Sequence, residues 1–444
     1  MTWLASPPLP PVQSEIAERT LRAALRAVDP AEAVRRALRL EGDRLWAGGD
    51  SFELDPRGSV RLLGLGKAAW PMTTAAAEIF GARAGGGVLV TKEGHLPPGA
   101  RLPGVTLLES GHPVPDERSL AAGEALLRAA AAAGPHDTLV ALLSGGGSAL
   151  ACAPVEGVSL AELQALTGEL LACGAAIGEI NALRRRLDRV KGGGLARACG
   201  AGQILVLALS DVTGDALESI ASGPFTPDPA PPGEARRILE RTGLAGRVPA
   251  ALRAHLEREI PAPGPEFSRV RHVLVGSNVL AARAALDQAR ADGLAPLLLT
   301  ACLQGEARQA GRFLACIARQ AAASGDPPPR PCCIVAGGET TVTLRGSGLG
   351  GRNQELALGA VEEMSGLEQA LLVALATDGG DGPTDAAGAW VNGETLQRAR
   401  SLNLEPARFL AQNDAYRFFD PLDGLIRTGP TRTNVCDLAL IFLF

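Results

Sequence analysis

The stretch TLVALLSGGGSAL, residues 138–150, decides the fold. Its first half is a continuous apolar run, which is typical of a parallel strand that helices cover on both faces. Its second half is a turn of three glycines and a serine, followed by an expected helix start. The sequence therefore predicts an α/β layer in which a glycine turn follows the carboxyl end of a central strand.

Similar apolar runs recur along the chain, separated by helical stretches rich in Ala, Leu, Arg and Glu. The other expected strands are 60–66, 87–92, 105–110 and 203–211 in the first part, and 272–277, 295–300, 332–339, 371–379 and 437–443 in the second. This alternation predicts two α/β domains with mostly parallel, helix-covered sheets. The proline-rich segments 226–234 and 261–265 suggest where the chain divides. We expect a Rossmann-like N-terminal domain over residues 1–255 and a C-terminal domain over 256–444.

The composition excludes several classes of protein. The chain has 444 residues, of which 46% are apolar, which suits two or three packed domains. Its net charge of −5 and its aromatic content of 3% argue against a nucleic-acid partner. No apolar run reaches the roughly 18–20 residues that span a bilayer, and the N-terminus shows no signal peptide. The cysteines suit the reduced core of an intracellular protein, so we expect a cytoplasmic location. Whether the protein forms a homodimer stays open.

Glycine-rich turns recur at the ends of the expected strands. They are GLGKAA (64–69), SGGGSA (144–149), SDVTGD (210–215), GSN (276–278), AGGET (336–340) and TDGGDG (377–382). Glycine lets backbone N–H groups approach a phosphate closely, and ligands of open parallel sheets bind beyond the carboxyl ends of the strands. Any one of these turns could serve packing alone. Their recurrence in both halves predicts an inter-domain cleft that holds a polyanion.

The glycine turns give the candidate cofactor-binding residues. We expect the SGGGSA turn and the turn VKGGGLA (190–196) to hold most of the polyphosphate, although neither matches a Walker A loop. The candidates are Ser144, Gly145, Gly146, Gly147, Ser148, Lys191, Gly192, Gly276, Asn278, Gly337 and Glu339.

Isolated charges beside glycines give the candidate catalytic and metal-binding residues. The chain has 43 basic residues but only three lysines, and Lys67 lies in a glycine turn, where a compact ammonium suits an anion. Arg352 follows glycines in GLGGRNQELAL, and its guanidinium could grip a carboxylate bidentately. Asp211 and Asp378 follow strands, where carboxylates can hold Mg²⁺, although aspartate is also a common turn residue.

Two alternatives stay open at this point. GLGKAA matches the loose dinucleotide pattern G-x-G-x-x-A, which would suit a dehydrogenase, but a lone match is a weak signal. A metal site on His95 or His112 is disfavoured, because neither histidine has a partner at metal-ligand spacing.

Several long motifs, in order, resemble one known family. They are ESGHPVPDERSLAAGEALL (109–127), LLSGGGSALACAPVEGVSL (142–160), GEINALRRRLDRVKGGGLA (178–196), LALSDVTGDALESIASGPF (207–225) and AGGETTVTLRGSGLGGRNQELAL (336–358). They resemble the class II glycerate kinases, whose C-terminal part is called the MOFRL domain, and the likeness runs from about residue 15 to the C-terminus.

This resemblance implies transfer of phosphate from ATP to the 2-hydroxyl of D-glycerate, giving 2-phosphoglycerate, with a divalent cation such as Mg²⁺. The lysine and the arginine of the family's motifs fall on Lys67 and Arg352. We accordingly expect Arg352 to bind the glycerate carboxylate, Asp211 to bind Mg²⁺ and Asp378 to accept the hydroxyl proton. Related sequences have carried the name hydroxypyruvate reductase, so an NAD(P)H-dependent reductase is the alternative.

Overall fold

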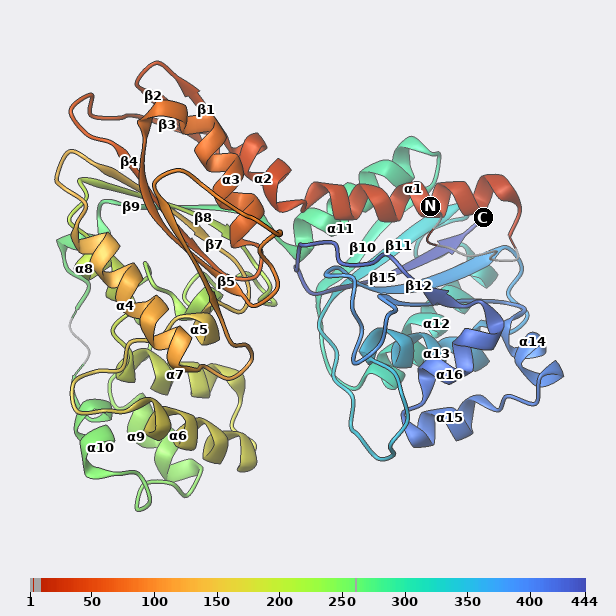
Figure 1. Cartoon of the computed structure of the whole chain (residues 1–444). Helices are drawn as coiled ribbons and strands as arrows, with labels where there is room; N and C mark the ends of the chain where they lie inside the picture. Colours follow the sequence, from red (N-terminus) through yellow and green to blue (C-terminus); the bar gives the residue numbers. More distant parts are fainter. Residues whose placement is uncertain (1–2, 4–8, 260–261) are drawn as a thin grey trace. The chain divides into compact units, whose positions relative to one another are not determined.

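The computed structural model describes residue 3, residues 9–259 and residues 262–444. The chain divides into two compact units, which Figure 1 shows with their elements labelled. One unit is Pro30–Val275; the other joins helix α1 (Pro11–Ala27) to Gly276–Phe444. No helix in the described part of the chain combines the length and the apolarity that a membrane crossing requires. The cleft expected between the domains stays a prediction.

The Pro30–Val275 unit is built on a six-stranded sheet with the order β6-β5-β4-β7-β8-β9. Its strands are β4 (Val60–Leu65), β5 (Ala84–Lys92), β6 (Val105–Ser110), β7 (Thr138–Leu143), β8 (Gln203–Leu209) and β9 (Val270–Gly276). The five strands from β6 to β8 are parallel, as the apolar runs predicted. Leu65 of β4 pairs with Leu143 of β7, and Leu143 pairs with Ala208 of β8. The turns after these three strands therefore meet at one edge of the sheet.

Helices cover both faces of this sheet. They include α2 (Pro30–Ala37), α3 (Ala69–Phe80), α4 (Glu117–Ala131), the short α5 (Gly147–Leu150) and α8 (Gly194–Ala198). Residues of β4, β5, β7 and β8 form one apolar core with α4 and α8. The opposite face packs on α3, and Gly64 lacks a side chain where Thr73 of α3 approaches.

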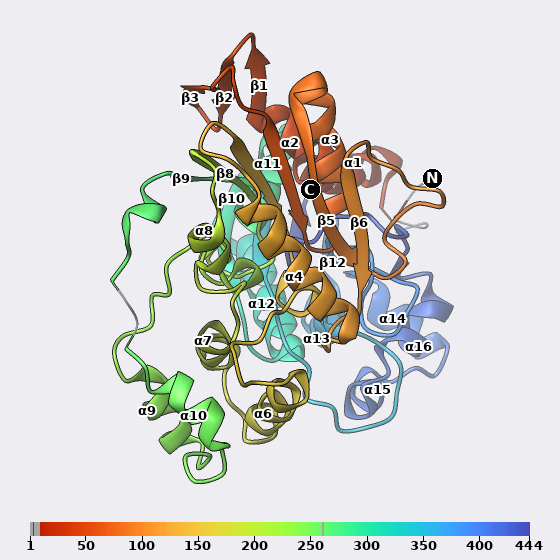
Figure 2. The ribbon, with the colours of Figure 1, turned by 60° about the vertical axis from the view of Figure 1, so that its left-hand side comes forward.

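Two small additions complete this unit. The sequence did not predict the antiparallel meander of β1 (Leu38–Glu41), β2 (Arg44–Ala47) and β3 (Asp50–Glu53). Four helices share a separate apolar core and gather at the lower end of the unit in Figure 2. They are α6 (Leu160–Ala172), α7 (Ile177–Leu187), α9 (Glu234–Arg241) and α10 (Ala250–Leu256).

The second unit has its own six-stranded sheet, with the order β10-β11-β15-β12-β13-β14. The strands are β10 (Ala295–Leu303), β11 (Cys332–Gly338), β12 (Ala370–Ala376), β13 (Gly388–Asn392), β14 (Leu425–Ile426) and β15 (Asp437–Leu443). Its helices are α1, α11 (Asn278–Ala291), α12 (Ala307–Ser324), α13 (Arg352–Met364), α14 (Thr395–Ser401), α15 (Pro406–Gln412) and α16 (Ala415–Phe419). Helices α12 and α13 share the sheet's apolar core, whereas α1 packs on α11.

The α/β architecture with two domains is confirmed, but the second sheet corrects one expectation. Only β10 and β11 run parallel there, and β11, β15, β12, β13 and β14 pair antiparallel in succession. A continuous apolar run shows that both faces of a strand are covered, but it carries no information about strand direction. The last strand, β15, inserts between β11 and β12, which no local pattern reveals.

The division of the chain differs from the expected boundary at residue 255 in two respects. Strand β9 lies beyond that boundary, yet it forms the edge of the first sheet beside β8. Helix α1 belongs to the second unit, where Arg19 pairs with Asp292 of the α11 end at 2.9 Å. The proline segment 261–265 that suggested the boundary begins at Pro261, which lies outside the described residues.

Candidate active site

The turns after β4 and β7 are joined by backbone hydrogen bonds. The Lys67 N–H donates to the Gly145 carbonyl at 2.9 Å, and the Ser144 N–H donates to the Leu65 carbonyl at 2.9 Å. The Ser144 hydroxyl accepts a hydrogen bond from the Ala68 N–H at 3.0 Å. Ser144 therefore fixes the shape of the Lys67 turn.

Glycines in the SGGGSA turn leave room for charged and polar neighbours. A Cβ atom on Gly145 would lie 1.9 Å from an Asp211 carboxylate oxygen. Gly146 has a left-handed φ of 82°, and a Cβ atom there would lie 3.1 Å from His112 and 3.3 Å from Lys67. The structure thus brings the expected residues Lys67, Gly145, Gly146 and Asp211 together at the edge where three parallel strands end.

This edge carries unused hydrogen-bond donors. Within the part of the chain that the structure describes, the N–H groups of Gly145, Gly146 and Gly147 have no acceptor. The Lys67 ammonium likewise has no carboxylate partner among those residues. Backbone donors and one cation of this kind suit a phosphate group. Ser148 instead has its hydroxyl 2.9 Å from that of Ser222.

His112 is a neutral imidazole beside these donors. Burial, with help from the positive charges of Lys67, Lys92 and His95, lowers the pKa of His112 to about 4. At neutral pH the ring can accept or donate a hydrogen bond without adding charge. From the sequence, His112 is considered only as a metal ligand. Its closeness to Gly146 and Lys67 arises from the fold, and no local sequence pattern indicates it.

Lys191 and Gly192 differ from their expected use. The Lys191 ammonium is buried, forms an ion pair with Asp188 and donates to the Ala151 carbonyl at 3.1 Å. The Gly192 N–H donates to the Ser222 carbonyl at 3.0 Å. Both groups therefore already serve the fold, although Lys191 also lines a cavity.

That cavity has a volume of about 420 Å³ and lies beside the SGGGSA turn. Gly146, Ser148 and Lys191 line part of it, and the other lining residues come from 112–115, from the end of the SGGGSA turn to Cys152, and from α6, α7 and Asp188. Burial raises the pKa of Cys152, another lining residue, to about 11, so its thiol is neutral. Every lining residue belongs to the Pro30–Val275 unit.

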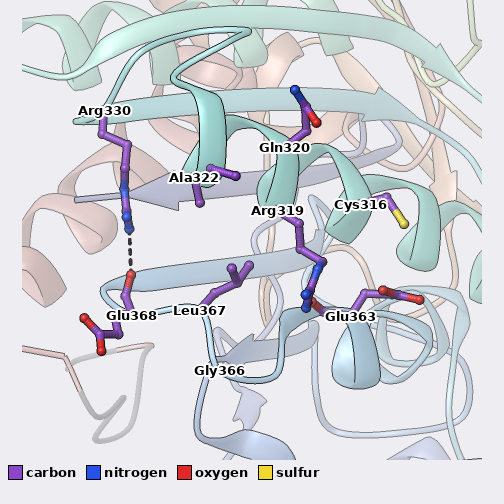
Figure 3. A pocket seen from close by; sticks show the side chains of 10 residues that line it. Cys316, Arg319, Gln320, Ala322, Arg330, Glu363, Gly366, Leu367 and Glu368 are labelled. Atoms are coloured by element: carbon purple, nitrogen blue, oxygen red, sulfur yellow. Dashed lines mark hydrogen bonds between the residues drawn. The ribbon is translucent and has the colours of Figure 1, made fainter.

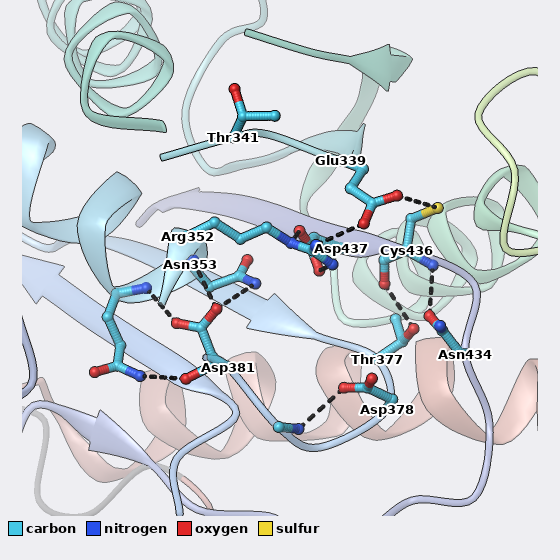
Figure 4. A network of polar contacts seen from close by, with 12 residues as sticks. Glu339, Thr341, Arg352, Asn353, Thr377, Asp378, Asp381, Asn434, Cys436 and Asp437 are labelled. Atoms are coloured by element: carbon cyan, nitrogen blue, oxygen red, sulfur yellow. Dashed lines mark hydrogen bonds and ion pairs between the residues drawn. The ribbon is translucent and has the colours of Figure 1, made fainter. Parts of the chain in front are cut away.

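A second group of expected residues surrounds Arg352 in the other unit (Figure 4). The Arg352 guanidinium binds Asp437 through Nε at 2.5 Å and through Nη2 at 3.0 Å. Its Nη1 donates to Glu339 at 2.5 Å. The register explains the meeting, because Asp437 begins β15 opposite the last residues of β11 and β12. Asp437 thus occupies the Nε–Nη2 edge of the guanidinium, through which Arg352 could otherwise bind a substrate carboxylate bidentately.

Burial controls the protonation of this group. It raises the pKa of Asp437 to about 6, although the hydrogen bonds and the charge of Arg352 act in the opposite direction. Burial acts to lower the pKa of Arg352, but the hydrogen bonds and charge of Asp437 and the charge of Glu339 raise it overall, so the guanidinium stays charged. Buried Asp381, whose pKa burial also raises, accepts the N–H groups of Asn353 at 3.0 Å and Gln354 at 2.8 Å. Asp381 therefore caps α13 and holds Arg352 at the helix start.

Of the remaining expected residues, Asn278, Gly337 and Asp378 lie around the same strand ends. Asn278 donates from its amide nitrogen to the Val435 and Asp437 carbonyls, each at 2.9 Å. A Cβ atom on Gly337 would lie 1.7 Å from the Asn278 side-chain oxygen, so only glycine fits there. Gly276 ends β9 two residues before Asn278. Asp378 accepts the Gly380 N–H at 3.0 Å in the turn after β12, and Figure 4 places it beside Thr377.

No preformed metal cage is found. Within residues 9–259 and 262–444, no group of three or more His, Cys, Asp or Glu side chains is placed to hold a metal ion. Mg²⁺ needs only one or two protein carboxylates when phosphate oxygens and waters complete its shell. The Asp211 carboxylate, packed against Gly145 beside the unused N–H groups, fits that requirement.

A further hollow of about 590 Å³ lies on the second unit (Figure 3). Its arginines are already bonded: Arg319 donates to the Glu363 carbonyl at 3.0 Å and Arg330 to the Glu368 carbonyl at 2.6 Å. None of the expected site residues lines this hollow.

The chain is similar to known proteins over most of its length. Residues 16–257 match the model of a domain of unknown function, DUF4147, and residues 332–437 match the MOFRL family. A glycerate 2-kinase from Pyrococcus horikoshii is 40% identical over 96% of both chains. A crystal structure of a glycerate kinase from Thermotoga maritima has a TM-score of 0.87 and 37% identity, and covers 97% of this chain and 99% of that one.

One relative carries a different name. A protein from Agrobacterium vitis, provisionally named a hydroxypyruvate reductase, is 39% identical over 87% of this chain and 88% of its own. Relatives that cover nearly the whole chain are kinases, and both matched domains contain motifs that carried the resemblance. The chain therefore belongs to the glycerate 2-kinase family of enzymes, which combines the DUF4147 and MOFRL domains.

Proposed function

We propose that this protein transfers phosphate from ATP to the 2-hydroxyl of D-glycerate, giving 2-phosphoglycerate. The observation that carries the proposal is the edge where β4, β7 and β8 end. Unused N–H groups of Gly145, Gly146 and Gly147, together with the Lys67 ammonium, provide positive potential for a phosphate there. Phosphoryl transfer depends mainly on such positioning and charge stabilisation.

We propose one role for each of the four charged candidates. Lys67 stabilises charge on the transferred group, and Asp211 is the protein ligand of Mg²⁺, which neutralises phosphate oxygens when bound. Arg352 binds the glycerate carboxylate through Nη1, where Glu339, whose side chain is 43% exposed, is the group to be displaced. Asp378 accepts the proton of the 2-hydroxyl.

The remaining cofactor candidates keep more limited roles. We propose that Ser144 shapes the phosphate-binding turn and that Ser148 borders it. Asn278 and Gly337 hold the strand ends around Arg352, and Gly276 ends the strand that precedes Asn278. Lys191 and Gly192 stabilise the neighbourhood of the SGGGSA turn through Ala151 and Ser222. The cytoplasmic location and the absence of nucleic-acid and membrane partners stay predictions, as does a homodimer.

The alternative is an NAD(P)H-dependent hydroxypyruvate reductase. The glycine pattern around Gly66 does not favour a dinucleotide site. A Cβ atom on Gly66 would lie 2.3 Å from the Ser144 hydroxyl, so packing against the turn after β7 already explains this glycine. Purified protein separates the two functions directly. The kinase consumes ATP only when D-glycerate and Mg²⁺ are present, whereas the reductase oxidises NAD(P)H with hydroxypyruvate and no ATP. Reductase turnover without kinase turnover would reject our proposal.

A further inference from the structure

The cavity beside the SGGGSA turn has two chemically different walls. Gly146, Ser148 and Lys191 form a polar side that adjoins the unused N–H groups. An apolar wall comes mainly from α6 and α7, through Leu160, Leu163, Leu171, Ile177 and Ile180, and residues 113–115 also line the cavity. A volume of about 420 Å³ falls in the range of small-molecule sites. Such a cavity suits a ligand with an apolar part and an anionic part.

Arg184 of α7 supplies an uncompensated positive charge to this cavity. Its neighbour Arg185 pairs with Asp228 at 2.7 Å, but among the described residues no carboxylate lies within ion-pair distance of Arg184. Asp188, one helical turn away, already pairs with Lys191. Burial lowers the pKa of Arg184, with the charge of Asp188 acting in the opposite direction.

A guanidinium held partly out of water without a counter-ion is costly, and an anionic ligand would remove that cost. D-Glycerate is small and polar throughout, so it would leave the leucine and isoleucine wall unpaired with anything apolar. A nucleoside triphosphate matches both walls, because a purine has apolar faces and the phosphates carry charge. The phosphates would also lie on the side nearest the donors of Gly145 and Gly146.

We propose that this cavity binds the nucleotide, with the base against the apolar wall of α6 and α7 and the phosphates at Arg184 and the SGGGSA turn. The inference rests on the proposed function, because it assigns the phosphate donor of that reaction to a place in the Pro30–Val275 unit. Arg184 is then a nucleotide-binding residue.

Two variants test the two walls separately. Arg184→Met removes the charge and keeps the length of the side chain, and Arg186→Met is its control, because Arg186 does not line the cavity. Gly168→Trp adds a ring to α6 at the cavity, where a Cβ atom meets no atom within 4 Å, and a melting curve checks that the variant folds. Gly178→Trp is its control, since Gly178 has the same open space and lies outside the lining.

Binding of MgADP and of inorganic tripolyphosphate is measured by calorimetry without D-glycerate, and the KM for D-glycerate is measured separately. Because a charge-assisted contact is lost, we expect Arg184→Met to weaken the binding of MgADP and of tripolyphosphate by about 10–100-fold. Gly168→Trp should weaken the binding of MgADP by about tenfold or more and leave the binding of tripolyphosphate unchanged. Both controls should stay within about twofold of the wild type for all ligands.

Several results would overturn the inference. MgADP binding that is unchanged in Arg184→Met and Gly168→Trp would remove the nucleotide from the cavity. A rise in the KM for D-glycerate with unchanged MgADP binding would assign the cavity to the acceptor instead. If Gly168→Trp also weakened the binding of tripolyphosphate, the base would not be assigned to the apolar wall. If the wild type binds MgADP in this pattern but does not phosphorylate D-glycerate, the proposed function fails and the nucleotide subsite stands.

Discussion

Asp437 accepts two hydrogen bonds from one edge of the Arg352 guanidinium, at 2.5 Å from Nε and 3.0 Å from Nη2. Asp437 is buried where three strands of the second sheet meet, the Arg352 side chain is partly exposed, and Asp381 caps the helix on which Arg352 lies. Arg352 is therefore held in a fixed direction before any substrate binds, which is what preorganised electrostatic binding requires.

Removal of Arg352 should destabilise the protein in a pH-dependent manner. Asp437 has a folded pKa of about 6 against an ordinary value of 3.8, so its contribution to stability is full below pH 3.8 and is lost as the pH rises through 6. Arg352→Ala removes the attraction that keeps this pKa from rising further. We expect the melting temperature of Arg352→Ala to fall below the wild type by more at pH 8 than at pH 5.

The expected loss at pH 8 is about 3 kcal/mol or more, the scale of a broken buried ion pair. Arg417→Ala serves as a control, because Arg417 pairs with Asp414 while its side chain is 64% exposed. Such an exposed pair is worth about 0–1 kcal/mol at either pH. Equal destabilisation of Arg352→Ala at both pH values would contradict this account of Asp437.

Lys67→Ala should lower kcat/KM by about 10²–10³ while the protein keeps its fold, since the ammonium has no partner among the described residues. Lys92→Ala is the matched control, because Lys92 ends the neighbouring strand β5. Steady-state kinetics and a melting curve on each variant check the prediction. Near-normal turnover in Lys67→Ala would exclude the proposed role.

Gly145→Ala should impair Mg²⁺-dependent turnover, because its Cβ atom would lie 1.9 Å from the Asp211 carboxylate and would displace it. We expect a higher Mg²⁺ concentration for half-maximal activity and a loss of activity of tenfold or more, on the order of one lost charged contact. Gly246→Ala, where a Cβ atom has open space, should behave as the wild type. An unchanged Mg²⁺ dependence in Gly145→Ala would argue against Asp211 as the metal ligand.

His112 should remain neutral at mildly acidic pH. Its folded pKa is about 4 against an ordinary value of 6.5, so the unfolded chain takes up a proton first as the pH falls. Stability therefore decreases between pH 6.5 and pH 4, and His112→Gln should lose less stability over that window. Nitrogen chemical shifts of the imidazole report the charge directly. A titration midpoint near 6.5 would show that the ring is not held neutral.

Local patterns predicted most of the strands, because most apolar runs mark segments that the fold buries. The run 437–443 coincides with β15, and 105–110 coincides with β6. The position of β15 between β11 and β12 depends on pairing across long sequence separations, which no local pattern encodes. The short meander strands were missed because four-residue runs such as Arg44–Ala47 are too short for a clear period.

The candidate site was only partly readable from the sequence. Glycine turns identified the Lys67 and Arg352 regions, because glycine is required where backbone and side chains approach closely. Asp437 escaped notice since it begins a strand far along the chain from Arg352. Arg184 sits in a run of three arginines, but its position four residues after buried Ile180 places it on the apolar face of α7. That spacing is the signal that could have singled it out.

Product analysis tests the central claim most directly. Purified protein is incubated with ATP, Mg²⁺ and D-glycerate, and the product is followed by ³¹P NMR and by conversion with enolase, which accepts the 2-phospho isomer. We predict stoichiometric formation of 2-phosphoglycerate and ADP, dependent on D-glycerate. Formation of the 3-phospho isomer, or ATP consumption that does not depend on D-glycerate, would contradict the proposed reaction.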